Sequence, residues 1–399
     1  MKFYRNIFEA VVISTSKIFN ENFYADKVIE KTLRQNPKWG ARDRKIIAET
    51  IYELVRWKRL YLLILDDDYT SIENIWKMVG VHFVLQNLTL PNWNEFSNLN
   101  AEAIQNKKKE FSKIRKIRES IPDWLDERGY SELGDQWSNE ISALNKQASV
   151  VIRTNEFLIS RDELQTKLLE ENIDTYKSSE LSSALILKER KNIFKTISFK
   201  SGFFEVQDIS SQLVAPSLMI EPGMRIIDAC AGAGGKTLHI ATLLNNKGKV
   251  ISLDTEAWKL NELKKRAGRN KLQNIETRLI ESQKTIKRLK ETADRLLLDV
   301  PCSGIGVLKR NPDTKWKLTN ERINELILLQ KDILSNYQVM LKPGGLLVYA
   351  TCSILPSENQ YQINSFLEMH KNFSLIDEKI ISPSASGFDG FYIATLKKH

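Results

Sequence analysis

The spacing of hydrophobic positions changes twice along the chain. Over the first 145 residues apolar side chains recur at helical intervals. The stretch RDRKIIAETIYELVRW, for example, places Ile47, Ile51, Leu54 and Val55 on one stripe with basic residues around it. The pattern predicts a helical region over residues 1–145.

From about residue 146, strand-like and helix-like hydrophobic patterns are mixed. SVVIRTN is typical of a strand, and SRDELQTKLLEEN is typical of a helix with Ser160 as its N-cap. Short strand candidates follow to about residue 200. Residues 146–202 are therefore predicted to form a small α/β module.

Strand and helix patterns then alternate regularly through residues 203–399. Uniformly apolar strands imply burial on both faces, which predicts an α/β domain with a doubly wound, mostly parallel sheet. Ligands of such sheets bind at the carboxyl ends of the strands. The expected strands are Met224–Ile227, Val250–Leu253, Ile275–Leu279, Arg295–Leu298, Leu346–Ala350 and Phe391–Leu396.

The charge balance favours a polyanionic partner. The chain carries 59 Lys and Arg against 50 Asp and Glu, a net charge of +9. Lys and Arg neutralise phosphates in nucleic acids. Residues 101–120 hold seven basic and three acidic residues, a composition that suits either a nucleic-acid contact or a solvated helix face. A basic protein without such a partner remains the alternative.

Several other classes of protein are disfavoured. The apolar start IFEAVVIS is interrupted by Glu9 and lacks a cleavage site, and no apolar run approaches the roughly 18 residues of a membrane helix. The three cysteines form no CxxC pair, so we expect no disulfide framework and a reducing, cytoplasmic setting. The four histidines are scattered, and no metal site is predicted.

A glycine-rich turn follows the first strand of the predicted sheet. In DACAGAGGKT, Gly232, Gly234 and Gly235 permit a tight turn close to a ligand, and the next helix should begin near Lys236. A phosphate-binding P-loop is the rival interpretation, supported by the strand-end aspartate of RLLLDV. Its first glycine, however, would fall at Cys230.

An acidic residue ends the second strand. Asp254 follows the glycine turn by about 20 residues, the position at which an acid binds the ribose of a nucleoside cofactor. A helix cap is the structural alternative. The pairing with the glycine turn favours a dinucleotide or S-adenosylmethionine over a nucleoside triphosphate.

Two cysteines follow two later strands. Asp299 and Cys302 follow the fourth strand, and Thr351 and Cys352 follow the fifth. If these strands are neighbours, both thiols and the carboxylate converge on one cleft. Methylation of carbon 5 of a pyrimidine needs such a set. A thiolate adds to carbon 6 and makes carbon 5 nucleophilic, and a second group removes the carbon 5 proton.

Three segments resemble signature motifs of the Sun/Fmu-type RNA cytosine-5 methyltransferases: DACAGAGGKT, DVPCSGIGVLKRNPDTKW and YATCSILPSEN. FEVQDISSQLVA is similar to the segment before the catalytic core of that family, and ARDRKIIAETIYELVRW is a fainter match to the NusB-like domain of its bacterial ribosomal RNA members. LKRNPDTKW is closest to members that act on small-subunit ribosomal RNA. The resemblance implies a Rossmann-like catalytic domain over residues 203–399, with an RNA-binding helical region in front of it.

The resemblance also implies roles for individual residues. Cys352 would be the nucleophile, Cys302 would help release the product, and Asp299 would hold both cofactor and base. The residues expected to bind S-adenosylmethionine are Cys230, Ala231, Gly232, Ala233, Gly234, Gly235, Lys236, Asp254, Glu281 and Asp299.

This sequence departs from the family pattern in two places. Ala233 stands where the family usually has proline, and Glu281 is the residue that aligns with the usual third-strand aspartate.

The leading interpretation is thus an S-adenosylmethionine-dependent RNA cytosine-5 methyltransferase. Its expected partner is RNA, and no membrane or metal partner is expected. A P-loop NTPase and a non-catalytic RNA-binding ribosome-assembly factor are the alternatives, and possession of both cysteines argues against the latter. After Cys352, Ser357 and Gln360 have the spacing of a capping box, which predicts a helix start in PSENQ.

Overall fold

The computed structural model describes residues 3–399, and these fall into two compact units. The first unit comprises Met1–Lys146 together with Leu308–Asn320, and the second comprises Gln147–Val307 together with Glu321–His399. The sequence pattern did not predict that residues 308–320 belong with the N-terminal helices.

The first unit is helical, and its longer helices are amphipathic. The predicted stripe on α3 is confirmed, because Ile47, Ile51, Leu54 and Val55 are all fully buried. These residues join an apolar core with side chains of the neighbouring helices. The helices of this unit are α1 (Arg5–Asn20), α2 (Ala25–Gln35), α3 (Ala41–Arg56), α4 (Lys58–Ile64), α5 (Ile72–Leu85), α6 (Ala101–Phe111), α7 (Arg115–Arg118), α8 (Asp123–Leu133), α9 (Gln136–Leu144) and α16 (Thr314–Lys317).

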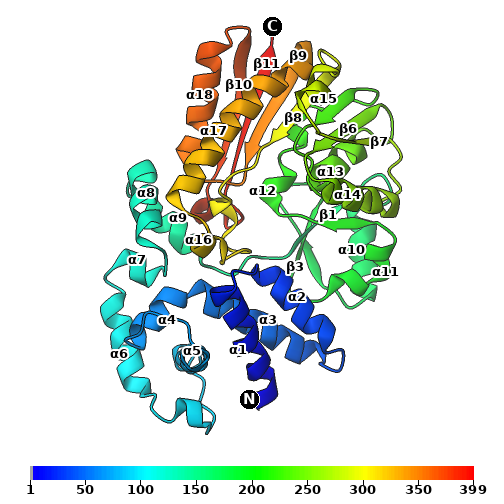
Figure 1. The fold of residues 1–399 in the computed structure, drawn as a ribbon. Helices are drawn as coiled ribbons and strands as arrows, with labels where there is room; N and C mark the ends of the chain where they lie inside the picture. Colours follow the sequence, from blue (N-terminus) through cyan, green and yellow to red (C-terminus); the bar gives the residue numbers. More distant parts are fainter. Residues whose placement is uncertain (1–2) are drawn as a thin grey trace. The chain divides into compact units, whose positions relative to one another are not determined.

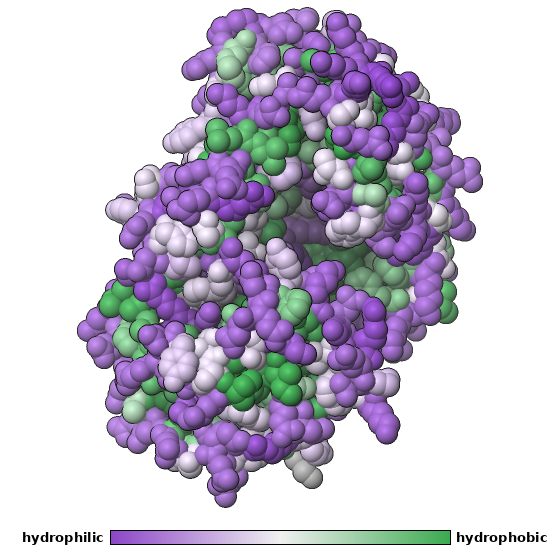
Figure 2. Space-filling model, in the orientation of Figure 1, coloured by the Kyte–Doolittle hydropathy of each residue, from purple (hydrophilic) through white to green (hydrophobic). Residues whose placement is uncertain are grey.

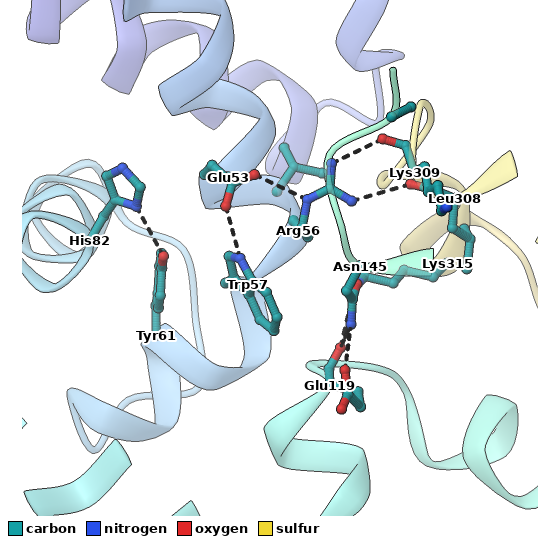
Figure 3. A network of polar contacts seen from close by, with 12 residues as sticks. Glu53, Arg56, Trp57, Tyr61, His82, Glu119, Asn145, Leu308, Lys309 and Lys315 are labelled. Atoms are coloured by element: carbon teal, nitrogen blue, oxygen red, sulfur yellow. Dashed lines mark hydrogen bonds and ion pairs between the residues drawn. The ribbon is translucent and has the colours of Figure 1, made fainter. Parts of the chain in front are cut away.

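Hydrogen bonds anchor residues 308–320 to this helical unit. The buried guanidinium of Arg56 donates to the carbonyls of Leu308 and Lys309, at 3.4 and 3.0 Å (Figure 3). Trp316 donates from its indole Nε1 to the carbonyl of Val55 at 2.7 Å. Lys315 is 1% exposed, and burial lowers its pKa well below the ordinary value.

The second unit begins with a small antiparallel sheet of order β2-β3-β1-β4. Its predicted helix is α10 (Arg161–Glu170), and Ser160 caps it in a capping box with Glu163. The strands are β1 (Val151–Thr154), β2 (Thr175–Lys177), β3 (Ala184–Leu187) and β4 (Phe204–Val206).

A seven-stranded sheet of order β10-β11-β9-β8-β5-β6-β7 forms the rest of the second unit (Figure 1). The ladder from β9 to β7 is parallel, whereas β11 pairs antiparallel with both β9 and β10. The strands are β5 (Arg225–Asp228), β6 (Lys249–Asp254), β7 (Ile275–Leu279), β8 (Ala293–Asp299), β9 (Leu341–Thr351), β10 (Phe373–Ile381) and β11 (Phe391–Lys398).

Alternate residues of the central strands pack into two separate cores. In β8, Leu296 and Leu298 belong to one apolar cluster and Leu297 belongs to the other. The sheet is therefore buried on both faces, which confirms the predicted doubly wound, mostly parallel architecture. The flanking helices include α13 (Gly235–Leu243), α14 (Ala257–Arg269), α15 (Gln283–Lys287), α17 (Asn320–Tyr337) and α18 (Gln360–Met369).

Two local predictions need correction. Strand β10 was not predicted, because most of its residues are exposed and its apolar positions do not alternate cleanly. The capping box at Ser357 and Gln360 was also wrong. A 3-10 turn, η6 (Pro356–Glu358), intervenes, and α18 starts at Gln360 with Asn359 as an N-cap that makes no side-chain capping bond.

Hydrophilic residues cover most of the face drawn in Figure 2, and the apolar patches between them are small. Over residues 3–399, no helix combines the length and the apolar character needed to cross a bilayer.

Candidate active site

Two cysteines meet where neighbouring parallel strands end. Strands β8 and β9 pair in register, with Asp299 opposite Ala350. Cys302 and Cys352 lie just beyond these strand ends, and their Sγ atoms are 3.3 Å apart. The structure therefore brings together the two thiols that the strand order was expected to align.

A lysine from the glycine turn joins this cluster. Lys236, in the first turn of α13, places its Nζ 2.6 Å from Oδ2 of Asp299 at the tip of β8. Burial alone would lower the pKa of Lys236, but the Asp299 carboxylate outweighs it and the pKa is raised. The site thus holds a charged Lys–Asp pair beside two thiols.

The surroundings raise the pKa of Cys302 and of Cys230. The pKa of Cys302 lies well above its ordinary value, because the Cys352 sulfur is beside it and because it is buried. Burial also raises the pKa of Cys230, and the carboxylates of Asp228, Asp299 and Asp254 reinforce the shift. Thiolates are the nucleophilic form, so Cys230 does not have the environment of an activated nucleophile.

The glycine turn is built for close backbone approach. Gly232 and Gly234 have φ angles of 53° and 90°, a region that glycine occupies without strain. A Cβ on Gly234 would lie 2.5 Å from Cγ of Leu263, whereas a Cβ on Gly232 or Gly235 would meet nothing within 4 Å. The turn therefore packs tightly on one side and is open on the other.

Asp254 is the last residue of β6, and its carboxylate is hydrogen-bonded to the glycine turn. Its Oδ2 accepts the amide of Gly232, and its Oδ1 accepts the amide of Glu256, both at 2.9 Å. It is not the N-cap of α14, which is Glu256. Of the other predicted turn residues, Ala231 is buried and Ala233 is half-buried. The carbonyl of Ala233 accepts from Arg266 at 2.7 Å.

Glu281 lies two residues beyond β7, and its side chain is exposed. The preceding residue, Ile280, donates its amide to the carbonyl of Asp254 at 2.9 Å. Glu281 thus lies at the same edge of the sheet as Asp254. Its role in cofactor binding stays a prediction.

Two buried carboxylates at this edge were missed by the sequence analysis. Asp228 is 1% exposed, and its Oδ2 accepts from the hydroxyl of Thr237 at 2.7 Å. Its Oδ1 has no hydrogen-bond partner among the described residues, and burial raises the pKa of Asp228 to about 7. Glu358 is fully buried behind the cysteines. For Asp228 the available signal was an acid that directly ends an apolar strand, whereas Glu358 lies in the polar segment PSENQ and has no such signal.

The residues described by the structure contain no cluster of three His, Cys, Asp or Glu side chains suited to a metal ion.

Residues 215–397 match the family model described as 16S rRNA methyltransferase RsmB/F, and residues 121–194 match the ferredoxin-like domain model of the same family. A probable ribosomal RNA small subunit methyltransferase B from Synechocystis sp. is 36% identical over 300 residues, covering 70% of this chain and 67% of that protein. Ribosomal RNA small subunit methyltransferase B from Erwinia tasmaniensis is 36% identical over 285 residues, covering 69% of this chain and 66% of that protein. The matches therefore span about two thirds of these relatives.

Solved structures share the fold. The structure of PH0851 superposes with a TM-score of 0.84 at 23% identity, covering 100% of both chains. A methyltransferase homologue from Pyrococcus horikoshii gives a TM-score of 0.64 at 25% identity, covering 71% of this chain and 98% of that one. These likenesses show the fold, whereas the family model and the relatives at 36% identity show that the chain belongs to the RsmB/F family of 16S rRNA methyltransferases.

Proposed function

We propose that this protein methylates carbon 5 of a cytosine in small-subunit ribosomal RNA, with S-adenosylmethionine as methyl donor and Cys352 as nucleophile. One observation carries the proposal: two thiols 3.3 Å apart lie beside the Lys236–Asp299 pair at the carboxyl edge of the sheet. The names of the relatives support ribosomal RNA as the substrate.

The glycine-turn edge fits S-adenosylmethionine, the cofactor of this methyltransferase family. The open backbone at Gly232 and Gly235 leaves room for a ligand. The unpartnered Oδ1 of buried Asp228 suits a positively charged ligand group. The segment from Cys230 to Lys236 would hold the cofactor together with Asp254 and, in the prediction, Glu281. When bound, the cofactor supplies an electrophilic methyl group carried on a sulfonium.

Cys352 is proposed to activate the base. Its sulfur forms a bond to carbon 6 of the cytosine, and the ring electrons displaced by that attack make carbon 5 nucleophilic. Both thiols lie within reach of one base, and the resemblance of YATCSILPSEN to the family motif that carries the nucleophile favours Cys352 over Cys302 for the attack. Once carbon 5 carries the methyl group, a base takes the carbon 5 proton, the electrons of that C–H bond restore the ring double bond, and the Cys352 sulfur leaves carbon 6 as a thiolate. Cys302 is proposed to assist this release step.

Asp299 is proposed to hold the base. A carboxylate can accept a hydrogen bond from the exocyclic amino group of cytosine or bind its protonated ring nitrogen. The Nζ of Lys236 fixes one oxygen of Asp299, which leaves the other to face a ligand. The pair thereby links the cofactor turn to the cysteine-bearing edge.

The helical region of residues 1–145 is proposed to dock RNA. Four of the seven basic side chains between residues 107 and 118 are neutralised by acids of the same unit: Lys107, Arg115, Lys116 and Arg118. Lys108, Lys109 and Lys113 have no ion pair within residues 3–399. Lys108 also lines a cavity of about 420 Å³ with Trp57 and Lys146. The unpaired lysines are the candidates for phosphate contacts.

The proposal is tested by incubating the protein with labelled S-adenosylmethionine and unmodified small-subunit ribosomal RNA. Mass spectrometry of the digested nucleosides should then detect 5-methylcytidine. A methyl group on another atom would contradict the cytosine-5 assignment. No transfer at all, with RNA still bound, would favour the non-catalytic ribosome-assembly alternative. Membership of the methyltransferase family removes the NTPase alternative.

A further inference from the structure

Glu358 is a buried carboxylate that links the two cysteine-bearing turns. It is 0% exposed and ends the 3-10 turn η6, six residues after Cys352. A buried carboxylate is costly unless hydrogen bonds compensate it. The donors that surround Glu358 therefore indicate what it holds in place.

Both oxygens of Glu358 accept from residues that adjoin the cysteines. Oε1 accepts the amide of Ser303 at 2.8 Å, and Oε2 accepts the hydroxyl of Ser303 at 2.5 Å. Oε2 also accepts the hydroxyl of Ser353. Ser303 directly follows Cys302, and Ser353 directly follows Cys352. One carboxylate is thus hydrogen-bonded to the residue after each thiol.

Gln330 connects the same carboxylate to the residue that precedes Cys302. Gln330, fully buried on α17, donates from Nε2 to Oε1 of Glu358 at 3.0 Å and to the carbonyl of Pro301 at 2.9 Å. The residues before and after Cys302 are therefore both tied to the same carboxylate, one directly and one through Gln330.

The Cys352 turn is held by the adjoining residue as well. Asn359 accepts from the hydroxyl of Thr351 at 2.5 Å and donates to the carbonyl of Ser353 at 3.0 Å. The amide of Gly306 reaches the carbonyl of Cys352 at 3.0 Å and forms a second link between the turns. Glu358 differs in that its side chain accepts hydrogen bonds from both serines, whose hydroxyls also bond to each other at 3.3 Å.

We infer that Glu358 is a positioning residue that sets the spacing of Cys302 and Cys352. Within residues 3–399 its carboxylate makes no hydrogen bond to either sulfur, so it acts through Ser303 and Ser353. Its kinetic consequence rests on the proposed two-cysteine mechanism, whereas the spacing itself can be measured without any methyl transfer.

The donors predict how substitutions will behave. Oε1 faces an amide N–H and a side-chain NH₂, which can only donate. Oε2 faces two hydroxyls, which can accept as well as donate. In Glu358→Gln, the amide oxygen can take the Oε1 place and the NH₂ group can donate to the two hydroxyls. Glu358→Ala loses every one of these bonds. A positioning role thus predicts rescue by glutamine.

The spacing is measured with dibromobimane, a reagent with two thiol-reactive arms. Each cysteine sulfur forms a bond to one arm and displaces bromide, and its proton goes to water. Peptide mapping identifies the Cys302–Cys352 cross-link, and monobromobimane reports the reactivity of each thiol alone. In Glu358→Ala we expect the cross-linked fraction to fall about tenfold, the factor for losing one hydrogen bond to a charged group. Glu358→Gln should stay within about twofold of the native protein, because its hydrogen bonds are retained.

A matched control removes a carboxylate from the opposite end of β8. Asp294 accepts the amide of Arg225 at 2.8 Å, at the strand end remote from the cysteines. Asp294→Ala should lower stability without changing the cross-linked fraction. In methyl transfer, Glu358→Ala should lower kcat with the calorimetric affinity for S-adenosylmethionine unchanged.

The outcomes separate the possibilities. A folded Glu358→Ala protein that cross-links like the native one would overturn the inference, as would glutamine and alanine variants that are equally impaired. If Glu358→Ala does not fold, Ser353→Ala takes its place, since it removes the bond from Ser353 to Glu358 together with the bonds of that hydroxyl to Ser303 and to the Leu355 amide, and it keeps the bonds from Ser303 to Glu358. An unchanged cross-linked fraction in Ser353→Ala would then overturn the inference. If the native protein transfers no methyl group, the proposed function fails while the cross-linking result stands.

Discussion

The Sγ atoms of Cys302 and Cys352 lie 3.3 Å apart, and each cysteine leaves a neighbouring strand of the parallel ladder. Two thiols at this distance can act in sequence on one ring without movement of either strand. The Lys236–Asp299 pair and the glycine turn lie at the same edge of the sheet. The residues proposed to bind the cofactor, to hold the base and to attack it therefore lie together.

Asp254 is predicted to anchor the cofactor. Asp254→Ala should weaken S-adenosylmethionine binding by about tenfold or more, because hydrogen bonds to a charged acceptor are lost. RNA binding should be nearly intact. Titration calorimetry measures the cofactor affinity, and Glu256→Ala removes a nearby exposed carboxylate as a control. Unchanged affinity in Asp254→Ala would remove Asp254 from the site.

Asp228 should make the cofactor-free protein less stable as the pH rises. Burial raises its pKa from 3.8 to about 7, so between these values the folded state holds a proton that the unfolded state has lost. The stability from that proton is complete below the unfolded pKa and is lost as the pH rises through about 7. Asp228→Asn should remove this part of the slope when unfolding free energies are measured from pH 4 to pH 8.

Asp294 provides a control of opposite sign for that measurement. Partial burial opposes the shift, but hydrogen bonds from Lys342 and the Arg225 amide lower the pKa of Asp294. Its contribution is present above the unfolded pKa and is lost as the pH falls. Asp294→Asn should therefore reduce stability mainly at neutral pH. Identical pH profiles for Asp228→Asn and the native protein would contradict the buried, unpaired state of Asp228.

Much of the catalytic fold was predictable from the sequence, because its strands are apolar on both faces and end in unusual residues. The runs that became β6, β8, β9 and β11 are largely apolar segments of this kind, whereas β7, at the other edge of the sheet, carries Glu276, Thr277 and Arg278. Strand β10 lacks that signal, since it lies at the edge of the sheet and exposes Ile376 and Ile380. Edge strands carry a weaker hydrophobic pattern because one side is unpaired and solvated.

The missed parts of the site depend on burial that residue type does not reveal. Glu358 and Asp228 are acids, which are ordinarily exposed, and the spacing of Ser357 and Gln360 suggested a capping box in place of the turn that buries Glu358. Residues 308–320 have the composition of a solvated loop. Their anchorage to the helical unit depends on buried Lys315 and Arg56, and both residue types are seldom buried.

The unpaired lysines of the helical unit should contribute to RNA binding. Replacement of Lys108, Lys109 and Lys113 by alanine should weaken RNA binding and reduce the slope of log affinity against log salt by about 2 to 3, the value for three lost phosphate contacts. Cofactor affinity should not change. A control that replaces Lys287, Lys290 and Lys371, exposed lysines of the other unit, alters the net charge equally. Equal salt slopes for the native protein and the first variant would reject this docking surface.

The central claim assigns different steps to the two cysteines, and one measurement separates them. Cys302→Ala and Cys352→Ala are each incubated with S-adenosylmethionine and unmodified small-subunit ribosomal RNA, and the products are resolved by denaturing electrophoresis. Cys302→Ala should retain the attack but not the release, so it should accumulate a protein–RNA adduct that survives denaturation. Cys352→Ala cannot form the sulfur–carbon 6 bond and should give neither adduct nor methylated RNA. An adduct from Cys352→Ala and none from Cys302→Ala would reverse the assignment, and retained activity with no adduct from either variant would contradict covalent catalysis by these residues.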